Sequence, residues 1–272
     1  MNNNRTRAQS YQSFLLEEAK RDFSVLLFYY MKREHLEYFL ETGNVKVTQL
    51  SKSNDPLEFL LNIEEPHKYS DLIRNTEHNE PLVVCLSSRI SSSTMWGHYA
   101  ESHKGVCLVF SLPIYKNLDD EKLGIHCYKI NRSGQTNDSD DSIIRVEYVD
   151  NRSYTTCIKD KPDLAKVINK AIATKASDWK YESEVRLRIR EESPYLLCDK
   201  GLFFYSGLKQ FFKGVVLGYK CEVADAYVRT LISASSFTDA FVARAEIQKD
   251  QYLMQPWLSD DIYICDTDIT SL

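Results

Sequence analysis

The sequence is poor in several features that mark common protein classes. Glycine and proline are scarce, with 9 and 7 residues in a chain of 272, and this composition argues against a disordered or low-complexity protein. No apolar run approaches 18 residues, so we expect no transmembrane helix and no membrane partner. The first seven residues are polar, which predicts that there is no signal peptide and that the protein is cytoplasmic.

Positive charge and paired cysteines are also lacking. The formal net charge is -5, whereas broad, non-specific binding of nucleic acids needs a basic face. The seven cysteines contain no CxxC pair, so we expect them to be reduced and mostly buried, with no metal bound. The sequence has no P-loop, GxGxxG, GxSxG or HExxH motif, which removes the usual signatures of several enzyme classes.

What the chain does contain is alternating apolar patterns rich in aromatic residues, with 17 Tyr and 12 Phe. Period-two patterns and short apolar runs rich in β-branched and aromatic residues predict strands, and stripes spaced by three and four residues predict helices. The expected strands cover residues 24–30, 45–48, 82–87, 106–112, 145–149, 181–190, 214–218, 241–247 and 262–265. The expected helices cover residues 9–20, 35–43, 56–63, 95–103, 163–177 and 223–232.

These patterns predict an α+β fold with a central, largely antiparallel sheet flanked by helices. Residues 1–22 are expected to form an N-terminal helical extension, and residues 23–272 a single mixed domain. The polar, Gly-, Asn- and Asp-rich stretch near residues 131–142 is expected to be a mobile loop.

The most unusual expected strand is Trp179–Arg190, because one of its faces is densely charged. Period two places Glu182, Glu184, Arg186 and Arg188 on that face. A solvated outer surface and a binding site both explain the pattern. In a site, the two carboxylates would position a ribose hydroxyl and stabilise positive charge on a sugar carbon, while the two arginines would hold phosphates.

A second cluster combines aromatic rings with imidazoles. If residues 95–103 are helical, Trp96, Tyr99 and His103 lie near one face, with His98 beside them. Such side chains suit stacking and hydrogen bonding to a planar ligand, such as a base or nicotinamide. A buried Trp and Tyr with satisfied histidines explains the same pattern without a ligand.

Two shorter features complete the set of candidates. Asp55, Pro56 and Glu58 have the spacing of a helix N-terminus, which leaves Asn54 without a local structural role. Tyr30 ends the first expected strand, where a core position is the ordinary explanation. A metal-dependent nuclease using Asp55, Glu58, Glu182 and Glu184 is a weaker alternative, since no regular metal-ligand spacing supports it.

Four segments together resemble a bacterial family catalogued as domain of unknown function number 2971. The family pattern contains an aromatic strand, "NDPxE", "MWxHYAxxHxG" and "WxYExExR". Here they are matched by Leu27–Tyr30, Asn54–Glu58, Met95–Gly105 and Trp179–Arg186. The resemblance spans about residues 25 to 220, and the family name carries no function.

The order of these motifs is also similar to that of ADP-ribosyltransferases. The resemblance implies such a fold, with NAD as the substrate, Glu184 contacting the nicotinamide ribose and Glu182 assisting it. Tyr30 stands where many of these enzymes have His or Arg, and Thr48 where they have Ser or Thr. Trp96 and His98 have no counterpart in that pattern.

The sequence therefore predicts an NAD-using ADP-ribosyltransferase or NAD glycohydrolase, of the kind used as bacterial toxins or antiviral effectors. Asn54, Asp55, Trp96, His98, Tyr99, His103 and Arg186 are the further candidates for ligand contact, besides Tyr30 and Thr48. The expected partners are a nucleotide-like small molecule and a protein or nucleic-acid target; the oligomeric state is left open. A non-enzymatic module that binds a nucleotide or a protein is the alternative.

Overall fold

Strands of one large mixed sheet run through most of the chain that the structure, a computed structural model, describes. The described residues are 24–55, 58, 81–116, 127–130, 141–151, 164–248, 253–259, 262–264 and 266–267. The expected N-terminal extension 1–22, the helix expected over 56–63 and residues 131–140 of the expected loop lie outside them, apart from residue 58.

Alternating apolar residues form the strands, and most expected strands are confirmed within a few residues. In chain order they are β1 (Ser24–Met31), β2 (Val45–Gln49), β3 (Leu82–Ser87), β4 (Val106–Lys116), β5 (Cys127–Ile130), β6 (Ser142–Arg145), β7 (Glu147–Val149), β8 (Thr174–Ala176), β9 (Glu184–Ile189), β10 (Leu196–Asp199), β11 (Leu202–Tyr205), β12 (Phe212–Leu217), β13 (Phe241–Gln248), β14 (Leu253–Ser259) and β15 (Ile262–Tyr263).

The large sheet has the order β10-β11-β2-β3-β9-β6-β5-β4-β12-β13-β14-β15, with β1 pairing both β3 and β4. Its pairings are antiparallel except for β12 with β13; the separate pair β7 and β8 is also parallel. The predicted α+β class with a largely antiparallel sheet is therefore confirmed. Strand β1 pairs with both β3 and β4, so the pairings form a circuit through β3, β9, β6, β5 and β4.

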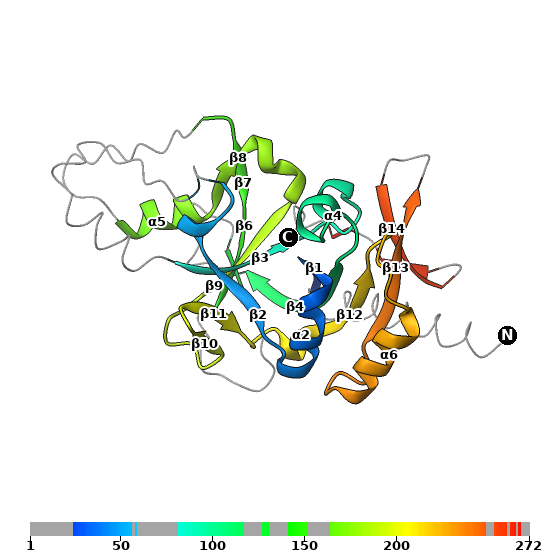
Figure 1. Cartoon of the computed structure of the whole chain (residues 1–272). Helices are drawn as coiled ribbons and strands as arrows, with labels where there is room; N and C mark the ends of the chain where they lie inside the picture. The colour runs from blue at the N-terminus through cyan, green and yellow to red at the C-terminus, as the bar shows by residue number, and fades with distance from the viewer. Residues whose placement is uncertain are drawn as a thin grey trace.

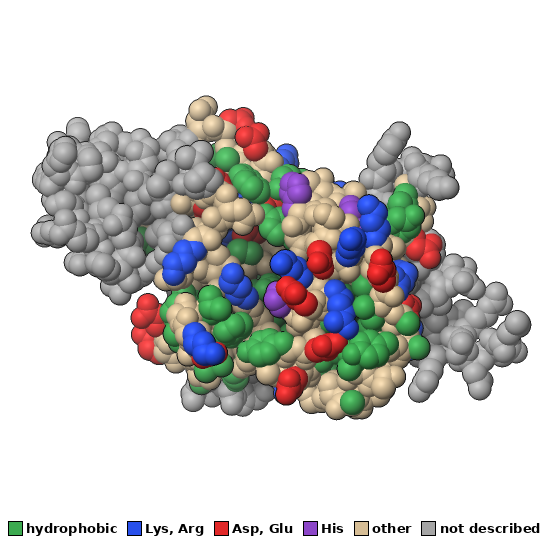
Figure 2. All heavy atoms as spheres, viewed as in Figure 1, with side chains coloured by type: hydrophobic (Ala, Val, Ile, Leu, Met, Phe, Trp, Pro, Cys, Tyr) green, Lys and Arg blue, Asp and Glu red, His purple; other side chains and the backbone are tan. Residues whose placement is uncertain are grey.

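Short helices cover this sheet. The α-helices are α2 (Leu36–Thr42), α4 (Ser93–Tyr99), α5 (Leu164–Ile172) and α6 (Asp225–Ala234), and the 3-10 helices are η1 (Arg33–His35), η2 (Leu50–Lys52), η5 (Ser177–Glu182) and η6 (Lys209–Phe211). Figure 1 shows α4 beside β1, and α2 near α6. Over the face seen in Figure 2, acidic and basic side chains are interspersed rather than segregated.

Local sequence explains two helix ends. Gly43 ends α2 in the left-handed conformation, with φ of 75°, as expected for a glycine at that position. The hydroxyl of Ser92 caps α4 by accepting from the backbone N–H of Met95, in agreement with the serine-rich turn in the sequence. The described part of the chain contains no helix both long and apolar enough to span a membrane.

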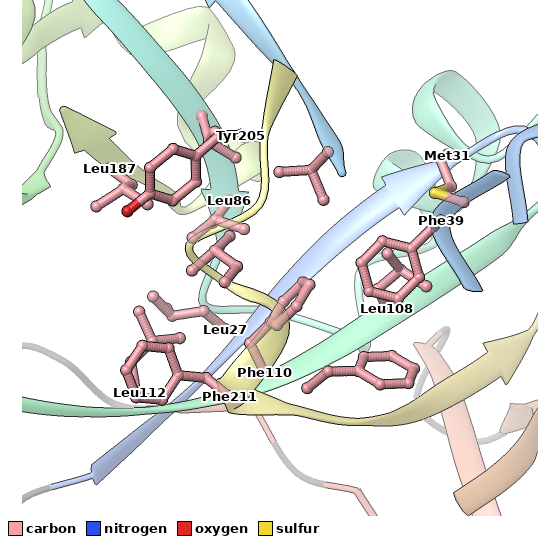
Figure 3. Close-up of a cluster of buried hydrophobic side chains, with 14 of the residues drawn as sticks. Leu27, Met31, Phe39, Leu86, Leu108, Phe110, Leu112, Leu187, Tyr205 and Phe211 are labelled. Atoms are coloured by element: carbon pink, nitrogen blue, oxygen red, sulfur yellow. The ribbon is translucent and has the colours of Figure 1, made fainter. Parts of the chain in front are cut away.

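The main core lies on the face of the sheet towards which Leu27, Leu86, Leu108 and Leu187 point (Figure 3). Phe110 joins this cluster, is fully buried, and contacts the rings of Phe39 and Phe212. The expectation of mostly buried cysteines is only partly met, because Cys107 and Cys221 are buried whereas Cys198 is exposed.

Truncation of Phe110 tests this core. We expect Phe110→Ala to lower the free energy of unfolding by about 3–5 kcal/mol, because a cavity replaces a fully buried ring. Urea denaturation measures the change. Ile247→Ala, at a side chain that is 46% exposed, is the matched control and should have little effect; equal losses in the two variants would contradict the assignment.

Candidate functional site

A cavity of about 250 Å³ lies where strands of the sheet separate. Strand β1 pairs with β3 only at Phe28 and Ser87, and otherwise follows β4. Strand β2 pairs with β3 only through Thr48 and Gln49, and its earlier residues pair with β11. The sheet is therefore open between β1, β2 and β3, and side chains rather than backbone hydrogen bonds line the space.

Six of the predicted site residues line this cavity. They come from β1, β2, the turn after η2, α4, η5 and β9, and they are Tyr30, Thr48, Asn54, Tyr99, Glu182 and Glu184. The sequence separates these residues by up to 154 positions (184 minus 30), so it is the fold that brings them together.

Glu182 and Glu184 do not belong to one continuous strand, although the sequence predicted one. Residues 177–182 form η5 rather than a strand, and β9 begins only at Glu184. Ser183 between them has φ of 44°, in the left-handed region, which is uncommon for a residue other than glycine. Its carbonyl accepts from the backbone N–H of Ser88, and the Ser87 hydroxyl donates to the Glu182 carbonyl at 2.6 Å, which holds the turn against β3.

The first three side chains of the charged face are not solvated, whereas Arg188 is half-buried. Glu182 and Glu184 are each only 4% exposed and Arg186 is fully buried, because β8, η5 and α5 lie over this side of β9. The side chains on the other face of β9, Val185 and Leu187, point into the main core as the alternation predicts. The solvated-surface explanation is therefore wrong for Glu182, Glu184 and Arg186, and the binding-site explanation stays a prediction.

Two cations hold the carboxylates in place. The Lys175 ammonium lies 2.6 Å from Glu182 Oε2 and 3.0 Å from Glu184 Oε2. The Arg186 guanidinium binds Glu184 through two nitrogens, each at 2.9 Å, and also pairs with Glu58. Its third nitrogen donates to the Ile172 carbonyl at 2.6 Å. All the side chains in this cluster are at least nine-tenths buried.

The surroundings shift the pKa values of the two carboxylates in opposite directions. Burial alone would raise the pKa of Glu184, but the charges of Arg186 and Lys175 outweigh it and lower the pKa to about 2. For Glu182, burial and then the Glu184 charge raise the pKa, and Lys175 only partly offsets them. Glu184 is thus held as a fixed anion, while Glu182 is the carboxylate that exchanges a proton more readily.

The low pKa of Glu184 predicts how stability depends on pH. A carboxylate whose pKa is lowered by folding adds stability above its unfolded pKa of about 4.3 and loses it as the pH falls towards 2. The loss attributable to Glu184 is on the order of 3 kcal/mol. Urea denaturation of Glu184→Gln between pH 5 and pH 2.5 should show a flatter acid limb than wild type; the exposed Glu192→Gln should keep the wild-type slope.

Tyr99 connects Glu182 to the mouth of the cavity. Its hydroxyl donates to Glu182 Oε1 and accepts from the Asn54 side-chain amide at 2.8 Å. The hydroxyl of Tyr181 lies 3.0 Å from His98 Nδ1 on the exposed side of this group. Tyr30 is mostly buried but also lines the cavity, and its hydroxyl donates to the Arg89 carbonyl at 2.7 Å.

The other predicted residues do not line the cavity. Trp96 is fully buried, where it packs edge-on against Tyr30, and His98 is on the outer side of α4. The expectation that His103 shares a helical face with Trp96 is wrong, because α4 ends at Tyr99 and residues 101–103 have positive φ. Asp55, which follows Asn54 in the sequence, is buried. Arg186 is buried among the carboxylates with which it forms ion pairs.

Sequence reasoning missed Lys175, Lys46, Lys52 and Cys85, all of which line the cavity. Lys175 lies in β8, within a stretch that the pattern predicted to be helical. Burial, and secondarily the Glu184 charge, raise the pKa of Cys85 well above its ordinary value, so its thiol is protonated at neutral pH and is a poor nucleophile.

The carboxylates at the cavity form ion pairs with two cationic side chains of the protein, Lys175 and Arg186. Among the residues that the structure describes, no group of three or more His, Cys, Asp or Glu side chains has an arrangement suited to a metal ion. Glu58, Glu182 and Glu184 instead all lie within 4 Å of the Lys175 ammonium, the longest distance being 3.7 Å to Glu58. The described geometry therefore gives the nuclease alternative no support.

Comparison with known proteins gives one family match. No curated protein and no solved structure matches the chain. The matched segment, residues 95–187, contains most of α4 and the two glutamates, whereas Tyr30, Thr48 and Asn54 precede it. Over that segment the chain is similar to the family described as "Protein of unknown function (DUF2971)".

Proposed function

We propose that the cavity cleaves the N-glycosidic bond between nicotinamide and ribose in NAD, and passes ADP-ribose to water or to an acceptor group. The observation that carries this proposal is the pair Glu182 and Glu184 at one cavity wall, with one carboxylate held ionised and the other raised in pKa. A buried anion next to a proton-exchanging group suits a reaction that builds positive charge on a sugar carbon.

The chemistry assigns each group a step. As the C1′–N bond breaks, its electron pair goes to the nicotinamide nitrogen and positive charge develops on the ribose. The fixed negative charge of Glu184 stabilises that charge. Glu182 accepts a hydrogen bond from a ribose hydroxyl and takes the proton of the attacking water, which later leaves to solvent. The balance is NAD⁺ and water giving nicotinamide, ADP-ribose and one proton.

Other side chains of the cavity fit the ligand. The rings of Tyr30 and Tyr99 offer surfaces for the planar nicotinamide. The Asn54 amide, which donates to Tyr99, keeps that ring in place. Sustained cleavage of NAD depletes the cofactor of a cell, and this consequence is the basis for proposing a toxin or defence effector.

The direct test is incubation of the purified protein with NAD, with nicotinamide and ADP-ribose followed by chromatography. We expect both products to accumulate linearly and in proportion to the protein concentration. No release above the protein-free control, from protein that unfolds cooperatively on heating, would overturn the proposal.

A second candidate is a nucleotide-binding module without turnover. It is favoured by the mutual satisfaction of Glu184 and Arg186, which already neutralise each other without any ligand. This candidate predicts that NAD raises the melting temperature in proportion to RT ln(1 + [L]/Kd) while no nicotinamide is released.

A further inference from the structure

Two lysines face the cavity from the wall opposite the glutamates. Lys46 belongs to β2 and Lys52 to η2, and both line the same space as Glu182 and Glu184. Both side chains are exposed at the cavity mouth. Within the described ranges, neither ammonium forms an ion pair, and the Lys52 ammonium donates to the Gln49 side chain. These two positive charges therefore remain available to an anion.

The arginines expected to hold phosphates are already committed elsewhere. The guanidinium of Arg186 donates hydrogen bonds to Glu184, Glu58 and the Ile172 carbonyl. Arg188 donates to the Asn169 side chain of α5 at 2.8 Å and does not line the cavity. Arg186 is fully buried, so the described geometry does not support phosphate binding by these two arginines, and that expectation stays a prediction.

The two glutamates line the cavity together with Lys175, whereas Lys46 and Lys52 reach it from β2 and η2. Strand β3 lies between β2 and β9 in the sheet order, so Lys46 and Glu184 belong to strands on either side of it. A ligand that spans the cavity would present its sugar to the glutamates and an anionic group to the lysines. The volume of about 250 Å³ is below the roughly 300–1,000 Å³ of pockets for drug-sized ligands, so the enclosed part suits one half of a dinucleotide.

We propose that Lys46 and Lys52 bind the phosphate attached to the ribose whose glycosidic bond faces Glu182. The ligand class is then a ribonucleoside 5′-phosphate unit, alone or as half of a dinucleotide, and the unphosphorylated nucleoside is a poor ligand. This assignment rests on the proposed function for the identity of the base, but the phosphate contact itself is measured by binding alone.

The test compares two ligands that differ only in the phosphate. Reduced nicotinamide mononucleotide and reduced nicotinamide riboside are suitable, because their neutral dihydropyridine is a poor leaving group and neither is consumed. We expect calorimetric titration to show about tenfold tighter binding of the mononucleotide to wild type, as two exposed ion pairs allow. Raising the salt concentration should reduce this preference.

Charge reversal then locates the contact. Lys46→Glu combined with Lys52→Glu should abolish the preference for the mononucleotide and leave affinity for the riboside nearly unchanged. Lys104→Glu combined with Lys200→Glu is the matched control, because both lysines are exposed and neither lines the cavity. Its net charge changes equally, and it should keep the wild-type preference.

The results separate this inference from the proposed function. Equal affinity of wild type for the two ligands, or a preference that survives the Lys46 and Lys52 reversal, would overturn the phosphate site. Failure to bind either ligand would also overturn it. If the mononucleotide binds through these lysines but NAD releases no nicotinamide, the phosphate site is supported and the proposed cleavage of NAD is contradicted.

Discussion

Glu182→Gln should reduce the rate constant for nicotinamide release by about 100-fold or more, the typical contribution of a general base. The amide is nearly the same shape as the carboxylate, but its single oxygen can accept from only one of Tyr99 and Lys175, which now donate to separate oxygens of Glu182. It cannot take a proton from the nucleophile, and it removes one negative charge from the cavity wall. Because the amide keeps the shape of the side chain and can still accept one hydrogen bond, KM should change far less than kcat.

Two further glutamates serve as comparisons for this result. Glu192→Gln makes the same chemical change at a side chain that is 79% exposed, and it should release nicotinamide at the wild-type rate. Glu184→Gln should also lose activity, and in addition unfold more easily, because Arg186 loses its paired carboxylate. If Glu182→Gln turned over NAD as fast as Glu192→Gln, Glu182 would have no role in proton transfer.

The sequence predicts those elements whose residues pack in the ordinary way. Apolar runs place β1 and β3 correctly and alternation places β13, since both faces of each of these strands meet a core cluster. Strand β14 is missed because it contains Pro256, a residue that normally argues against a strand between two neighbours. Strand β8 is missed because its three residues follow directly on a strong helical stripe.

Prediction of the site fails where long-range contacts decide the geometry. Period two correctly places Glu182 and Glu184 on one side, although Ser183 is left-handed and no local signal predicts that conformation at a serine. The charge partner Lys175 could not be found from spacing, because it reaches the glutamates through the packing of β8 and η5 against β9. The missing information was therefore tertiary rather than local.

Arg186→Met should lower the free energy of unfolding at neutral pH by about 3–5 kcal/mol, the usual cost of removing one partner from a buried ion pair. Methionine fills much of the volume of the arginine stem, so little of this cost comes from packing. The loss arises because Glu184 and Glu58 keep their negative charges in a buried site with only Lys175 beside them. Urea denaturation at pH 7 measures it, with Arg190→Met, at a side chain 53% exposed, as the control.

The pH dependence of this variant identifies the charge as the cause. In wild type, Arg186 and Lys175 keep the pKa of Glu184 near 2, so lowering the pH from 7 towards 4 leaves this carboxylate ionised and stabilising. Without Arg186, burial raises the pKa of Glu184, and a raised pKa makes stability increase as the pH falls. The difference between Arg186→Met and wild type should therefore shrink between pH 7 and pH 4. A difference that stayed constant with pH would assign the cost to packing, and adding Glu184→Gln to Arg186→Met should then recover no stability.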